Sequence, residues 1–158
     1  MNKIQYKDRD QRMYPFLEFI RDDHRTCDHL YTDAENALAA KNTDEAKRLF
    51  GEFYRATNHH FDMEERELFV TFEKRTGMMG GPTQMMRYEH QQLRAQLEAM
   101  LRALNEGKHD DFFGIGESFM IMLQQHNMKE EQMLYPMIDR TLGDDATLMI
   151  QILKEMPQ

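Results

Sequence analysis

The chain contains one set of histidine and glutamate residues twice. Two triplets match under a shift of 66 positions along the sequence: His24, His60 and Glu64 in the first half, and His90, His126 and Glu130 in the second. Within each triplet the two histidines are 36 residues apart, and the glutamate follows four residues after the second histidine. Unrelated surface residues have no reason to keep a common offset, so we expect both halves to direct these side chains toward one point.

The histidine and glutamate of each pair are spaced for one face of a helix. Residues four positions apart lie about one helical turn apart on the same side. His60 and Glu64 therefore point the same way, as do His126 and Glu130. A single pair of this kind is usually a surface contact. The repetition and the apolar residues that flank both pairs favour a metal site instead.

Apolar residues recur with a helical period through almost the whole chain, and no segment alternates as a strand does. Proline, glycine and capping residues divide the sequence into helices predicted at residues 15–40, 44 to the low 70s, 82–107, 110–136 and 144–155. Pro136 is expected to bend or end the fourth helix, and Gly114 and Gly116 to weaken its first turns. Short connections make antiparallel neighbours, which predicts an all-α, up-down-up-down four-helix bundle with a short C-terminal fifth helix.

The whole chain, residues 1–158, is predicted to be a single domain. Its expected parts are an N-terminal arm at 1–13, the bundle at 15–140 and a C-terminal helix at 144–156. That last helix carries Leu148, Ile150, Ile152 and Leu153, which can cap the bundle or form the face of a homodimer.

The predicted hairpins place their histidines at equal heights. In the first hairpin His24 and His60 both lie 16 residues from the connection, which is about 24 Å along a helix axis. In the second hairpin His90 and His126 lie 17 and 16 residues from theirs. Because the arms match, docking the hairpins side by side can bring all four imidazoles into one layer.

Four imidazoles and two carboxylates fit two metal ions better than one. If both glutamates bridge, each ion has two nitrogen and two oxygen ligands, with room for a bridging oxo or hydroxo group and an open position. Nitrogen and oxygen ligands without thiolate suit iron or manganese, and zinc is also compatible. The single cysteine, Cys27, is interpreted as a core residue.

Several nearby polar residues are predicted to lie outside the ligand set. Glu65 and Glu131 are turned about 100° from the ligand glutamates and are expected to form ion pairs. His29 and His59 also point away from the ligand face, and His109 is expected in a solvated turn. Asp28, four residues after His24, is a candidate hydrogen-bond acceptor for a metal-bound imidazole.

Composition narrows the range of partners. The formal net charge is −8 and no basic cluster occurs, so nucleic acid is not an expected partner. No apolar run is long enough for a membrane span, and the charged N-terminus does not read as a signal peptide. Together with a single cysteine, these features predict a cytoplasmic protein.

The motifs resemble those of the hemerythrin-like, HHE cation-binding domains. The resemblance lies in the order of His, His-Phe-x-x-Glu-Glu-x-x-Leu-Phe, Glu-His and His-x-x-x-Glu-Glu-x-x-Leu-Tyr-Pro over roughly residues 15–140. It implies a four-helix bundle with a non-haem di-iron centre whose ligands are the residues of the two triplets, His24, His60, Glu64, His90, His126 and Glu130. Classical oxygen carriers of this family have a further histidine where this chain has Met86, and an aspartate where it has Glu130. The four-His, two-Glu set is similar to that of the repair-of-iron-centres proteins.

Three functional interpretations follow. The first is a di-iron protein that engages O2, NO or peroxide in sensing, detoxification or iron handling. The second is a di-metal enzyme, although no acid, base or nucleophile is evident beside the ligands. The third is a helical interaction module with a structural or vestigial metal. The sequence leaves open whether the protein is an enzyme.

Overall fold

The computed structural model describes residues 14–158, which form helices and no strand. Seven α-helices are found in this range: α2 (Pro15–Ala39), α3 (Thr43–Met63), α4 (Phe69–Thr76), α5 (Pro82–Asn105), α6 (His109–Lys129), α7 (Tyr135–Leu142) and α8 (Ala146–Glu155). Two π-helical turns and one 3-10 turn join some of them: η1 (Glu64–Leu68), η2 (Glu130–Leu134) and η3 (Gly143–Asp145). The predicted arm at residues 1–13 lies outside the described residues.

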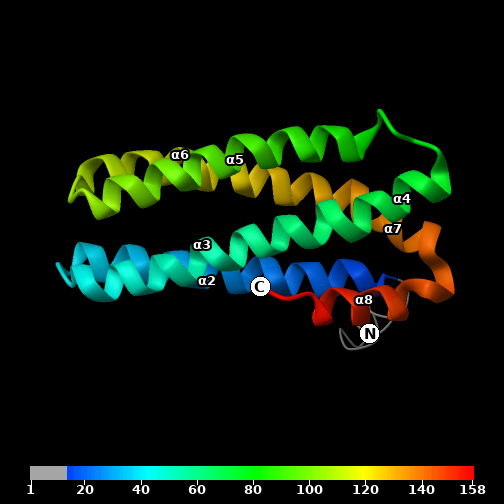
Figure 1. The fold of residues 1–158 in the computed structure, drawn as a ribbon, viewed down its shortest axis with the longest axis horizontal. Helices are drawn as coiled ribbons and strands as arrows, with labels where there is room; N and C mark the ends of the chain where they lie inside the picture. The colour runs from blue at the N-terminus through cyan, green and yellow to red at the C-terminus, as the bar shows by residue number, and fades with distance from the viewer. Residues whose placement is uncertain (1–13) are drawn as a thin grey trace, which may run out of the picture.

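The helices form two antiparallel hairpins that lie side by side. Figure 1 shows α2 and α3 as one hairpin and α5 and α6 as the other, with both connections at the same end of the bundle. The turns η1 and η2 continue α3 into α4 and α6 into α7, so the second and fourth rods of the bundle each consist of three segments. The predicted up-down-up-down four-helix bundle is therefore confirmed.

Local sequence explains where the rods begin and end. Pro15 and Pro82 occupy first helical turns, where a missing N–H costs nothing. The Asn42 side chain accepts a hydrogen bond from the Glu45 N–H at 3.4 Å and caps α3. Gly77 ends α4 with φ of 73°, a conformation that favours glycine.

The fourth rod departs from the prediction at Pro136. The helix neither ends nor breaks there, because Pro136 falls in the first turn of α7, directly after η2. A proline in that position has no α-helical hydrogen bond to lose. The rod continues to Leu142, six residues beyond the predicted limit.

Two hydrophobic clusters fill the bundle above and below the histidine layer. The cluster toward the hairpin connections includes Cys27, Phe61, Leu93 and Leu123. The cluster toward the other end gathers side chains from α2, α7 and α8, and its members include Ile20, Met63, Met86 and Leu134. The histidines lie between members of these clusters along each rod, so the layer is enclosed by apolar packing on both sides.

The C-terminal helix α8 packs along α2 (Figure 1). Met149 and Leu153 are buried against the bundle, whereas Leu148 and Ile152 are 63% and 36% exposed. The structure thus shows α8 packed along α2, and both the cap and the homodimer face stay predictions. No helix within residues 14–158 combines the length and the apolar character that a membrane crossing requires.

A buried carboxylate joins the start of the bundle to its end. Asp139 on α7 accepts hydrogen bonds from the backbone N–H groups of Phe16 and Leu17, at 3.0 and 3.3 Å. The first N–H groups of a helix have no partner within the helix, and these bonds satisfy two of them in α2. Burial outweighs both bonds and raises the pKa of Asp139 to about 6.

This raised pKa gives an expected pH dependence for an Asp139→Asn variant. Between the unfolded pKa near 3.8 and the folded pKa of about 6, the native state binds a proton that the unfolded state lacks. The native carboxyl group therefore contributes more stability as pH falls. We expect the wild type to gain stability relative to Asp139→Asn between pH 7 and pH 5, measured by urea unfolding. A difference that does not change with pH would contradict the raised pKa.

Two glycines in α6 provide a second test of packing. A Cβ on Gly116 would collide with the Tyr31 hydroxyl and lie 3.2 Å from the Met100 methyl. Gly114, two residues earlier, is exposed and would meet nothing within 4 Å among the described residues. We expect Gly116→Ala to destabilise the protein by about 1–3 kcal/mol, and Gly114→Ala to stabilise it by about 0.5–1 kcal/mol. The Tm of each variant, measured by thermal unfolding, is the readout. Equal changes in Tm for the two variants would contradict the close contact of Gly116 with Tyr31 and Met100.

Candidate metal centre

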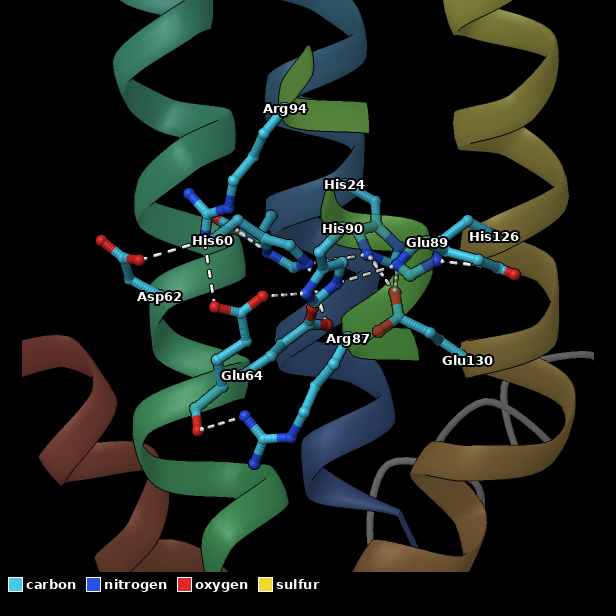
Figure 2. Close-up of polar contacts among 12 residues, drawn as sticks. His24, His60, Asp62, Glu64, Arg87, Glu89, His90, Arg94, His126 and Glu130 are labelled. Carbon is cyan, nitrogen blue, oxygen red and sulfur yellow. Dashed lines mark hydrogen bonds and ion pairs between the residues drawn. The ribbon is translucent and has the colours of Figure 1, made fainter. Parts of the chain in front are cut away.

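Four imidazoles meet in the middle of the bundle, one from each rod. The Nε2 atoms of His24 and His60 are 3.1 Å apart, and those of His90 and His126 are also 3.1 Å apart. All four residues are at least nine-tenths buried. Figure 2 shows these side chains converging between the rods. The predicted common layer is therefore confirmed, and each hairpin contributes one pair.

Two buried glutamates connect the histidine pairs. Glu64 places Oε1 3.1 Å from His60 Nε2 and Oε2 2.9 Å from His90 Nε2, so its carboxylate spans both hairpins. Glu130 places Oε1 3.3 Å from His126 Nε2 and 3.5 Å from His24 Nε2. Both carboxylates are completely buried.

The six side chains make up two overlapping groups that have metal-binding geometry. The groups are His24, His60, Glu64 and Glu130, and Glu64, His90, His126 and Glu130. Within each group the candidate ligand atoms lie within 4.8 Å of one another, and both groups share the two glutamates. This is the arrangement expected if two cations shared both carboxylates.

Neighbouring carboxylates orient three of the imidazoles through Nδ1. His60 Nδ1 lies 2.6 Å from Asp23, His90 Nδ1 lies 2.8 Å from Glu65, and His126 Nδ1 lies 3.1 Å from Glu89. A neutral imidazole that donates its Nδ1–H to a carboxylate carries a lone pair on Nε2. Such carboxylate–histidine pairs fix the ring and make Nε2 a stronger ligand.

The central atoms need a cation. Lone pairs on two Nε2 atoms 3.1 Å apart repel each other unless positive charge lies nearby. Both oxygens of Glu64 and Oε1 of Glu130 are buried without a hydrogen-bond partner among the described residues. Unpaired buried carboxylate oxygens are costly, so the donor set fits metal ions that prefer nitrogen and oxygen ligands.

Electrostatics also favour positive charge at the centre. Burial alone would lower the pKa of His60, but the Glu64 carboxylate and a hydrogen bond to Asp23 outweigh it and hold this pKa well above its ordinary value. Burial likewise opposes the charged form of His126, yet Glu130 raises its pKa to about 10. Burial would raise the pKa of Glu130, but the charge on His126 keeps it well below the usual range. Protons or metal cations can supply this charge.

One contact makes the two glutamates unequal. The Tyr135 hydroxyl donates a hydrogen bond to Glu130 Oε2 at 3.0 Å. The shift of 66 residues places Phe69 at the corresponding position near Glu64, and a phenyl ring cannot donate such a bond. Glu130 is therefore anchored by one oxygen, whereas both oxygens of Glu64 face imidazoles. The sequence indicated a nearly symmetric set, and the structure shows this asymmetry within it.

Both π-turns start at the paired glutamates. The Glu64 carbonyl accepts from the Phe69 N–H and the Glu130 carbonyl from the Tyr135 N–H, each five residues ahead. The neighbouring Glu65 carbonyl accepts from Arg87 Nη1 at 3.2 Å. Single π-turns often mark functional sites. The sequence offered no signal for them beyond the repetition itself.

The structure also places the other candidates. Glu131 forms the expected ion pair with Arg21. Glu65 pairs with Arg94, as expected, but it also holds His90. Sequence reasoning missed the role of Asp23 and Glu89, which orient His60 and His126. The two carboxylates match each other under the 66-residue shift, and this match was the signal that could have identified them. Asp28 does not reach His24, because its Oδ1 and His24 Nδ1 both lack partners within residues 14–158.

The remaining histidines and the cysteine lie outside both metal-binding groups found in residues 14–158. His29 is exposed, while His59 and His109 are partly exposed. His109 begins α6 rather than lying in a turn. Burial raises the pKa of the Cys27 thiol to about 11, so it stays protonated and belongs to the core, as predicted.

Comparison with known proteins agrees with the geometry. A sequence model of the family described as hemerythrin HHE cation binding domain matches residues 15–138. No curated protein and no solved structure gives a significant match. The matched region contains both hairpins and all six central residues, which confirms the resemblance seen in the motifs. The chain is therefore a metal-binding protein that belongs to the hemerythrin HHE cation-binding domain family.

Proposed function

We propose that the six central residues hold two iron ions and that the protein engages a small ligand, O2, NO or peroxide, in sensing, detoxification or iron handling. The observation that carries this proposal is the pair of overlapping His2Glu2 groups that share both glutamates. Two iron ions held by His24, His60, Glu64, His90, His126 and Glu130 would supply a redox-active centre for such a ligand.

The residues around the groups support this role. Asp23, Glu65 and Glu89 hold three imidazoles in the orientation that presents Nε2 to the centre. Phe61 stacks on His90 with ring centroids 4.2 Å apart, and Phe69 lies 5.8 Å from the same imidazole. The two rings belong to the clusters above and below the layer, so they restrict water around His90 from both directions and keep the local dielectric low.

The chemistry of the donors favours iron or manganese over softer metals. All candidate donors are imidazole nitrogens and carboxylate oxygens, and the Cys27 thiol stays protonated. Fixed carboxylates on the Nδ1 side increase the basicity of the imidazoles, which suits a centre that must stabilise higher oxidation states. Zinc can also bind such donors, and a purely structural zinc is the alternative to be tested.

Metal analysis with spectroscopy tests the proposal. Protein from iron-supplemented cells is expected to contain about two irons per chain, one for each group. Its near-ultraviolet absorption should change when anaerobic, reduced protein meets air, NO or hydrogen peroxide. One zinc per chain without any spectral change would refute the redox role and leave an interaction module with a structural metal. Repeated turnover of peroxide or NO, as opposed to a stoichiometric reaction, would identify an enzyme.

A further inference from the structure

A surface cavity reaches the histidine layer at His24. It has a volume of about 420 Å³ and lies between α2 and α6. His24 forms part of its lining, together with Asp28 from α2 and Asn127 from α6. The cavity therefore connects the surface with the edge of an imidazole whose Nε2 faces the metal groups.

Three of the residues that line this cavity each carry a polar atom without a partner. His24 Nδ1, Asp28 Oδ1 and Asn127 Oδ1 are buried and have no hydrogen-bond partner among residues 14–158. His24 and Asn127 are only 7% and 8% exposed. Buried polar atoms without partners are costly, and a molecule in the cavity would supply the missing bonds.

The internal repeat provides an equivalent surface without this cavity lining, between α3 and α5. We call that surface the closed face and the α2–α6 surface the open face. The shift of 66 residues moves Asn127 onto Phe61 and Asp28 onto Arg94, between α3 and α5. There Arg94 donates to Asn58 at 2.7 Å and to Asp62 at 3.1 Å, and its guanidinium lies 5.3 Å from the Phe61 ring centroid. On this opposite face side chains occupy the positions where the α2–α6 face has a cavity.

A rearranged ion pair explains the unpartnered nitrogen of His24. On the closed face Glu73 binds Arg87 at 2.9 Å, which leaves the Glu65 carboxylate to accept from His90 Nδ1. On the open face the residue equivalent to Glu73 is Asp139, which caps α2 instead. Arg21, the equivalent of Arg87, then pairs with Glu131 at 3.1 Å. His24 therefore lacks the carboxylate that its counterpart has.

The lining of the cavity is polar and balanced in charge. Arg21 and Arg25 supply two positive charges, and Asp28 and Glu131 supply two negative charges. Such a lining gives no net attraction to an ion. The unpartnered atoms comprise two oxygen acceptors and an imidazole nitrogen that donates when Nε2 faces the metal groups. A small neutral molecule with both O–H donors and lone pairs matches them.

We propose that the cavity beside His24 is the route by which small neutral hydrogen-bonding molecules reach and leave the metal centre, with hydrogen peroxide entering and water leaving. Asn127 and Asp28 position the molecule at the inner end, and Asn127 is the residue that keeps the route open. This inference rests on the proposed di-iron function and specifies its ligand class.

Replacing Asn127 by phenylalanine copies the closed face into the open one. In the iron-loaded protein, hydrogen peroxide takes one electron from each of two Fe(II) ions and two protons from solvent, which leaves two Fe(III) ions and two waters. We expect Asn127→Phe to slow this oxidation at least about tenfold with unchanged iron content. Asn127→Leu, which is close to asparagine in size, is expected to slow it in the same direction and covers the case in which the phenylalanine variant does not fold.

Asn58→Ala is the matched variant on the opposite face, because Asn58 accepts a hydrogen bond from Arg94 and lies outside both candidate groups. Arg94 keeps its bonds to Asp62 and Glu65 in this variant, so we expect the oxidation rate to stay within about twofold of the wild type. Faster oxidation in Asn58→Ala, together with unchanged rates in both Asn127 variants, would place the route between α3 and α5 and overturn the proposal.

A crystal structure of the zinc-loaded protein gives a readout that does not involve reactivity. Ordered water, or peroxide after soaking, should bridge His24 Nδ1, Asp28 Oδ1 and Asn127 Oδ1 in the wild type and be absent from Asn127→Phe. A cavity that holds no ordered solvent at these atoms would overturn the proposal. A chain that binds zinc but no iron, yet shows this solvent, would refute the di-iron function and leave the cavity assignment intact.

Discussion

Replacing Glu64 by alanine is expected to reduce bound iron from about two ions per chain to less than one, because this residue belongs to both candidate groups. The variant leaves three candidate ligands in each group. It also removes the carboxylate whose two oxygens face His60 and His90 in different hairpins. Iron per chain, measured after gel filtration, is the readout.

Glu67→Ala provides the control for this substitution. Glu67 lies three residues later in the same π-turn but outside both candidate groups. Its removal should leave iron content unchanged. Equal iron in wild type and Glu64→Ala would show that the central groups are not the binding site. Loss of iron in both variants would point instead to a general disturbance of η1.

Removing the metal is expected to cause the largest loss of stability. Without a cation, pairs of Nε2 atoms 3.1 Å apart face each other, and three buried carboxylate oxygens lack partners in the described chain. An ion present at about a thousandfold its Kd stabilises a folded protein by about 4 kcal/mol. For a domain of this size, that corresponds to a fall in Tm of about 10 °C after chelation.

Calorimetry before and after chelation measures this effect. Adding back iron or zinc should restore the Tm of the wild type, because either ion can accept nitrogen and oxygen ligands. The same addition should not restore the Tm of Glu64→Ala. If chelation left the Tm unchanged, the six residues would be stable as a proton-linked network and the metal would be unnecessary for the fold.

The fold and the central cluster could be predicted because both depend on regular spacing. Helical period, capping residues and connection lengths fix how far each histidine lies from its turn. Equal distances in both hairpins then bring His24, His60, His90 and His126 to one layer. This reasoning uses only the rise of a helix and the lengths of its arms, so no side-chain detail is needed.

The local details of the site could not be obtained in this way. The π-turns at Glu64 and Glu130 depend on a backbone hydrogen bond to the fifth residue ahead, which no residue type specifies. Asp23 orients a histidine on a neighbouring rod, and periodicity within one helix does not report contacts between helices. Whether Pro136 ends the rod could not be decided from the sequence either, because that depends on the preceding π-turn.

The contact between Asp139 and the N–H groups of Phe16 and Leu17 has a consequence for the order of synthesis. It joins residues 123 and 122 positions apart, and the adjoining hydrophobic cluster also combines α2 with α7 and α8. Chains emerge from the ribosome N-terminus first, so His24, His60 and Glu64 are made long before the carboxylate that secures the start of α2. All six candidate ligands are present only after Glu130 has been translated, and the start of α2 is secured only after Asp139 follows.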